Sequence, residues 1–124
     1  MKRFVDTHTL VRATLWGVLL HVVLALLAHF STWVAENLYM FGWMMCSATA
    51  GYLYGMWIGR SYALGALGGA IAGGVSALPV IVLTVLVGDS EAAMVSVGPG
   101  VCILTGGVGG AFGHMSAIMR KLGL

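Results

Sequence analysis

Two histidines, His21 and His114, are the residues of this sequence best placed to hold a cofactor. Each lies in a long uncharged stretch, His21 eight residues after position 13 and His114 four residues before position 118. If both stretches are helices with these ends on the same side of a membrane, the two rings lie within about 6 Å in depth. Such a pair suits the axial ligands of a haem b or a proton relay. Because haem needs space, we favour the alternative that His21 hydrogen-bonds a neighbouring carbonyl or hydroxyl group.

A second group of side chains could bind a soft metal ion. Met40 and Met44 are four residues apart, and His29 is predicted to lie at a similar depth on the preceding helix. Thioether and imidazole groups suit a copper-like ion. The Met40-x-x-x-Met44 spacing resembles the paired methionines of the copper-uptake trimers of the Ctr family, but this chain departs from that family in having four predicted spans and no Met-rich outer tail. The alternative is that these methionines, with Cys46 and Cys102, fill gaps in an apolar interior.

Other chemistry is excluded by what the predicted spans lack. They contain no Asp, Glu, Lys or Arg, which argues against a pump driven by a membrane carboxylate. Paired carboxylates, a Ser-His-Asp order and a phosphate-binding loop are also absent. We therefore expect no catalytic residue, no enzymatic activity, no nucleic-acid partner and no resident cofactor, with haem and copper as the alternatives.

The elements that carry these residues are predicted from the distribution of charge. The chain of 124 residues is 60% hydrophobic and 8% charged, with a mean hydropathy of +0.99, whereas soluble domains carry about 25% charged residues. The charges leave four long uncharged stretches, and about 20 apolar residues suffice to cross a bilayer. We predict one all-α integral membrane domain, residues 1–124, forming a four-helix bundle with spans near 13–35, 38–59, 63–87 and 95–118.

The charges also predict the orientation of the bundle. All six basic residues lie before the first span, between the second and third, or after the fourth, whereas the other two connections carry only Glu36, Asp89 and Glu91. The positive-inside rule then places both termini in the cytoplasm and the protein in the cytoplasmic (inner) membrane.

Glycines recur at spacings that suit close helix packing, because membrane helices associate through small residues. The predicted packing faces lie on spans two, three and four and comprise Gly51, Gly55 and Gly59; Gly65, Gly69 and Gly73; and Gly106, Gly110 and Gly113. These faces exceed what one bundle needs, which favours contacts with further copies or with other membrane subunits. Pro79 is predicted to kink span three, and Gly98-Pro99-Gly100 either interrupts span four or gives a simple kink.

Together these features predict a small membrane protein that acts as a self-associating or complex-embedded subunit of channel or transport type. A haem-binding redox subunit using His21 and His114 is the first alternative. A copper-like conduit using His29, Met40 and Met44 is the second.

Overall fold

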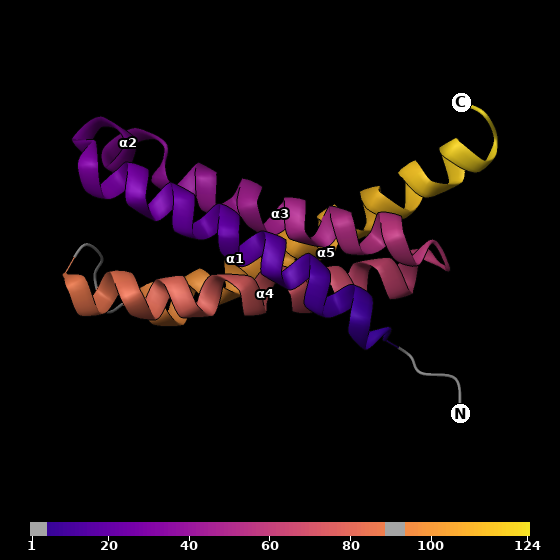
Figure 1. Cartoon of the computed structure of the whole chain (residues 1–124), viewed down its shortest axis with the longest axis horizontal. Coiled ribbons are helices and arrows are strands. Elements are labelled where there is room, and N and C mark those ends of the chain that lie inside the picture. Colours follow the sequence, from indigo (N-terminus) through magenta and orange to yellow (C-terminus); the bar gives the residue numbers. More distant parts are fainter. Residues whose placement is uncertain (1–4, 89–93) are drawn as a thin grey trace.

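The computed structural model describes residues 5–88 and 94–124, with the side chain of Met94 excepted, and this part of the chain is all-helical. Figure 1 shows four long helices lying side by side and one short helix at an end of the bundle. Their bounds are α1 Thr7–Phe30, α2 Thr32–Asn37, α3 Tyr39–Ile58, α4 Tyr62–Val87 and α5 Met94–Lys121.

The first helix differs from the predicted span 13–35 at both ends. It begins at Thr7 because the Asp6 carboxylate accepts hydrogen bonds from the hydroxyl and the backbone amide of Thr9, the latter at 3.1 Å. These bonds hold the pKa of Asp6 below its ordinary value. The helix ends at Phe30 because Ser31 adopts an extended conformation and its hydroxyl caps the separate helix α2 at Val34.

A three-residue turn reverses the chain between α3 and α4. Gly59 ends α3 in the left-handed conformation (φ +54°), which glycine adopts without strain. Arg60 follows, and the Ser61 hydroxyl accepts a hydrogen bond from the Leu64 amide at 3.2 Å to start α4. The short turn makes α3 and α4 antiparallel neighbours.

Three of the described helices, α1, α4 and α5, are long and apolar enough to cross a membrane by length and composition. Helix α3 has 20 residues and no charged side chain, but it is rich in Gly, Tyr and Trp and is not among the three. The predicted second span, 38–59, is therefore not identified by the hydropathy of α3.

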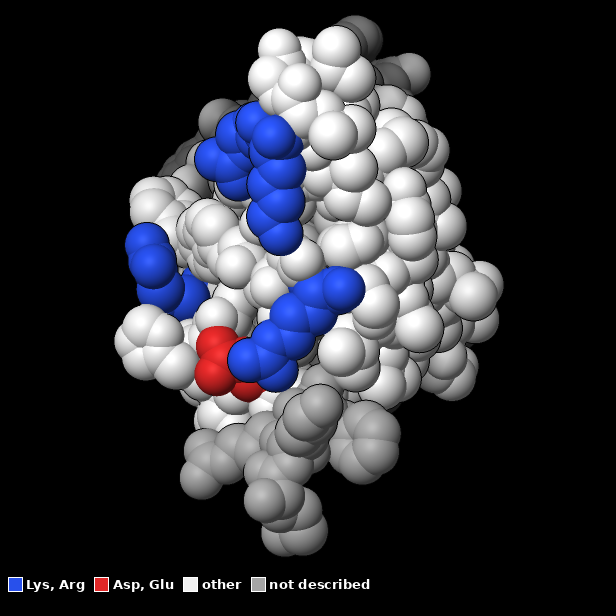
Figure 2. All heavy atoms as spheres, turned by 90° about the vertical axis from the view of Figure 1, so that its right-hand side faces the viewer, with Lys and Arg blue, Asp and Glu red and all other residues white. Residues whose placement is uncertain are grey.

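The long helices form two unequal layers. Helices α3, α4 and α5 pack tightly against one another, and α1 packs on α3 and α4 without contacting α5 in the described residues. In Figure 1 the first turn of α1, the C-terminus and the α3–α4 turn lie at one end of the bundle, whereas α2 lies at the other. Figure 2, viewed from the first of these ends, shows basic side chains gathered there. The described ones are Arg12, Arg60, Arg120 and Lys121.

Neither proline interrupts its helix. Pro79 lies within α4, and α5 runs continuously from Met94 through Pro99 to Lys121. Of the two alternatives at Gly98-Pro99-Gly100, an interruption and a simple kink, the interruption is not observed. Each proline removes one backbone hydrogen bond, and the remaining turns keep the helical path.

Candidate functional site

The predicted glycine faces of α3 and α5 lie against each other. A methyl group added at Gly51 would lie 2.7 Å from the carbonyl carbon of Gly106, and one added at Gly55 would lie 2.8 Å from that of Gly110. Ordinary contacts of a methyl group begin near 3.4 Å. The two backbones are thus so close that only glycine fits.

The glycines of α4 meet the same face of α5 from the other side. A methyl group at Gly69 would lie 2.5 Å from the Gly106 carbonyl oxygen, and one at Gly73 would lie 2.8 Å from its Cα. Gly65 is similarly placed, with the carbonyl oxygen of Gly110 at 2.8 Å.

Two of the predicted glycines have other neighbours. Gly113 packs on the α3 backbone, with the amide nitrogen of Met56 at 2.8 Å from an added methyl group. Gly59 has only ordinary contacts and instead forms the α3–α4 turn. The close contacts of these glycines lie within this chain.

A polar cluster lies at the junction of α1, α3 and α4. His21, Ser47 and Ser76 come one from each helix and are fully buried. The His21 Nδ1 lies 2.7 Å from the Gly17 carbonyl oxygen, and because a carbonyl only accepts, Nδ1 carries the proton. The Ser47 hydroxyl oxygen lies 3.4 Å from His21 Nε2. The cluster thus fixes one tautomer of a buried imidazole.

The carbonyl oxygen of Gly73 completes the cluster. It accepts a hydrogen bond from the Ser76 hydroxyl at 3.0 Å and lies 3.4 Å from the Ser47 hydroxyl oxygen. Gly17 lets α1 approach, because a methyl group there would lie 2.7 Å from the Ser76 hydroxyl oxygen. Close helix contact therefore places these polar groups together.

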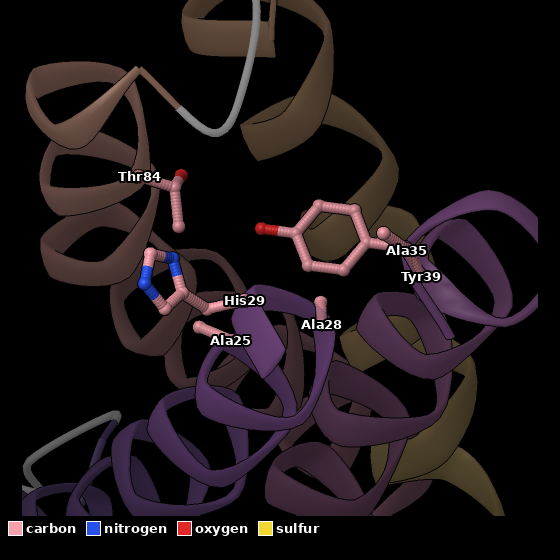
Figure 3. Close-up of a pocket in the computed structure, with 6 residues that line it drawn as sticks. All are labelled: Ala25, Ala28, His29, Ala35, Tyr39 and Thr84. Carbon is pink, nitrogen blue, oxygen red and sulfur yellow. The ribbon is translucent and has the colours of Figure 1, made fainter. Parts of the chain in front are cut away.

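A cavity of about 120 Å³ opens at the end of the bundle away from the basic residues. Figure 3 shows His29 of α1 and Thr84 of α4 on one side of it and the hydroxyl of Tyr39 of α3 pointing toward them. Three alanines line the remainder, namely Ala25, Ala28 and Ala35. We call this space the outer cavity.

The outer cavity and the buried cluster lie on the same three helices at matching intervals. His29 follows His21 by eight residues, Tyr39 precedes Ser47 by eight, and Thr84 follows Ser76 by eight. Eight residues rise about 12 Å along a helix. We call this two-level arrangement the α1/α3/α4 seam.

A single apolar layer separates the two levels. Ala25, Trp43 and Val80 each lie midway in sequence between the polar residues of their helix, and they belong to one packed cluster. The Trp43 ring contacts that of Tyr39 at 5.6 Å between centroids and that of His21 at 4.9 Å. Trp43 is 2% exposed, and its indole N–H has no hydrogen-bond partner among the described atoms.

The two histidines predicted as a haem pair have separate surroundings. His114 lies on α5, and its ring packs edge-on against Tyr62 at 4.6 Å between centroids. His21 lies on α1, which does not contact α5 in the described residues. The structure thus supplies no shared site for a haem between them.

The predicted soft-metal residues are also not gathered into one site. His29 lines the outer cavity, where the neighbouring α3 residue is Tyr39 rather than Met40 or Met44, and Met40 is half exposed. Among the described residues no group of three His, Cys, Asp or Glu side chains is placed to hold a metal ion. Cys46 and Cys102 are free thiols.

Sequence reasoning missed the neutral members of the seam. Ser47, Ser76 and Thr84 carry no charge, so a search for ionisable groups does not find them, and Tyr39 and Trp43 are of residue types that are also common at membrane interfaces. The signal was present as paired polar residues at eight-residue intervals on three hydrophobic helices.

Comparison with known proteins adds no assignment to this geometry. No family model, curated protein or solved structure matches the chain.

Proposed function

We propose that this chain is a four-span integral membrane protein of transport type, with both termini and the basic end in the cytoplasm. The observation that carries this proposal is the α1/α3/α4 seam, a line of polar side chains inside an otherwise apolar bundle. Polar groups within membrane helices are costly and mark pathways for ions or protons. The outer cavity gives this line an opening on one side.

The packing of α3 supports its assignment as a membrane span beside α1, α4 and α5. Helix α3 contacts α5 through Gly51 and Gly55 and is joined to α4 by a three-residue turn. Since α4 and α5 are apolar enough to cross a bilayer, a helix packed along both lies at the same depth. Its polar groups then face protein rather than lipid.

The charges support the orientation. Four described basic residues lie at the end that also carries the first turn of α1 and the C-terminus, and Glu36 lies in α2 at the opposite end. Lys and Arg remain on the cytoplasmic side during insertion, so this end faces the cytoplasm and the outer cavity faces away from it. The surrounding bilayer is the first partner of the protein, and other copies or subunits join it through its lipid-facing sides.

Ion flux through liposomes containing the purified protein tests this function. We expect proteoliposomes to pass protons or a small monovalent ion faster than empty liposomes. In a variant lacking both native cysteines, Thr84→Cys, which lines the outer cavity, should make this flux sensitive to a membrane-impermeant thiol reagent. Leu86→Cys on the same helix is the matched control, because Leu86 is 79% exposed and lies outside the cavity. Folded protein without any such flux would contradict the proposal.

A further inference from the structure

We propose that His21 is a reversible proton-binding site inside the bundle, reached from the outer cavity along the α1/α3/α4 seam and separated from it by the indole of Trp43. This inference rests on the proposed transport function and names the proton as the species that enters the seam. The site is the buried imidazole of His21, a titratable group at a position where an apolar side chain would also fill the space.

The surroundings of His21 suit both protonation states of its ring. In the neutral state Nδ1 donates to the Gly17 carbonyl and Nε2 accepts from the Ser47 hydroxyl. In the charged state Nε2 donates to the Ser47 oxygen instead, and the Ser47 hydroxyl turns to the Gly73 carbonyl, which lies at the same 3.4 Å. Rotation of one hydroxyl group therefore satisfies the site before and after a proton binds.

The charge of the imidazolium is met by dipoles alone. Helix α1 contributes the Gly17 carbonyl to the surroundings of the ring, and α3 contributes the ring and carbonyl of Trp43 and the Ser47 hydroxyl. Helix α4 contributes the Gly73 carbonyl, which contacts the Ser47 hydroxyl. The Cys102 thiol of α5 lies beside Ser47. None of these groups carries a charge, so no fixed counter-ion prevents the proton from leaving again.

The step itself is a simple proton transfer. A hydronium ion in the outer cavity gives up a proton, one of its O–H bonds breaks, an N–H bond forms at Nε2 of His21, and neutral water remains. The barrier is the layer of Ala25, Trp43 and Val80. Each of these residues lies four positions along its helix, or about 6 Å, from the polar level above it and from the polar level below it. A change in the Trp43 side-chain rotamer would admit a chain of hydrogen-bonded water molecules to the seam, along which the proton passes to Nε2.

Access to His21 is one-sided in this structure. Below the polar cluster the seam is filled by Ala13, Ala50 and Ala72, all 0% exposed, and by Tyr54. The Tyr54 hydroxyl lies in this layer, is buried and has no hydrogen-bond partner among the described residues, so it does not connect His21 to the basic end by a hydrogen bond. The site therefore exchanges protons with the outer side.

Nitrogen NMR of the wild-type protein tests this inference directly. Histidine labelled with ¹⁵N distinguishes imidazole from imidazolium, and the His21 signals are assigned by their loss in His21→Gln. With the liposome interior held at constant pH, we expect the His21 signals to change from neutral to charged as the external pH is lowered from about 8 to about 4, the range in which histidine titrates. Signals that stay neutral throughout, or that follow only the internal pH, would overturn the inference.

The barrier is tested with variants of similar size. Trp43→Phe should speed the response of His21 to a jump in external pH severalfold, whereas Trp33→Phe, at a residue 62% exposed near the same end, should not. An unchanged response in folded Trp43→Phe would overturn the barrier role.

The two proposals can fail separately. Flux through liposomes with a His21 that does not titrate would leave the transport function standing and remove the proton site. A titrating His21 in a protein that passes no ion would support the site and contradict the transport function.

Discussion

The replacement of Gly106 by alanine tests a close backbone contact between α4 and α5. A methyl group at this position would lie 2.9 Å from the Cα of Gly73 and closer still to the carbonyl oxygen of Gly69. Since ordinary contacts begin near 3.4 Å, α4 and α5 must separate by at least several tenths of an ångström. Both opposing groups are backbone and cannot move alone.

The adjacent residue supplies a matched control. A methyl group at Gly107 would meet its nearest neighbours, the Ala66 carbonyl oxygen and the Ala70 Cβ, at 3.5 and 3.6 Å, which are ordinary contacts. Both substitutions replace glycine by alanine inside α5, so the gain in helix propensity of about 1 kcal/mol is common to the two. The difference between them isolates the steric effect.

We expect Gly106→Ala to lower the free energy of unfolding by about 1–3 kcal/mol relative to Gly107→Ala, the usual cost of overpacking. The assay is unfolding in mixed dodecyl maltoside and SDS micelles, followed by tryptophan fluorescence. Equal stability of the two variants would refute the inference that α4 and α5 meet through their backbones at this glycine.

Three further outcomes follow from other contacts. Because hydrogen bonds from Thr9 lower the pKa of Asp6, the stabilisation of the first turn of α1 should be present above the ordinary value of 3.8 and lost as the pH falls through the lower folded-state pKa. Protection of the Thr9 amide from exchange, relative to its intrinsic rate at each pH, should then fall at acidic pH in the wild type and be low at every pH in Asp6→Ala. Tyr52→Phe and Ser116→Ala should each lower stability, and the double variant should be less destabilised than their sum by about 0.6 kcal/mol, because the two hydroxyl groups are 2.8 Å apart. Native mass spectrometry in mild detergent should give masses without a haem increment, and a haem-sized addition would reopen the redox alternative.

The polar seam depends on geometry that hydropathy does not encode. His21 was identified from its type and depth, but its hydrogen bonds to Gly17 and Ser47 come from helix rotation. The pairing with His114 was an alternative that rested on similar depth, whereas the favoured interpretation, a hydrogen bond from His21 to a neighbouring carbonyl, is confirmed. Depth follows from residue number, whereas facing direction follows from the packing of neighbouring helices.

Some helix boundaries could be predicted from the sequence, and others depend on local hydrogen bonds. Uncharged stretches located the four long helices approximately, because a charge marks the edge of an apolar run. They misplaced the end of the first helix, since Ser31 ends it through a local hydrogen bond to Val34 rather than through charge. The continuity of α5 through Pro99 also required the structure.

The sequence by itself determined that the chain is helical and apolar, where its long helices lie, and that its basic residues fall at positions sharing one end of the bundle. These properties follow from composition and from the order of charges along the chain. The tertiary structure decided which glycine faces meet, that Gly51 opposes Gly106 and that the His21 ring lies beside Ser47 and Trp43. Those contacts depend on the rotation and crossing of each helix, which close packing sets through residues distant in sequence.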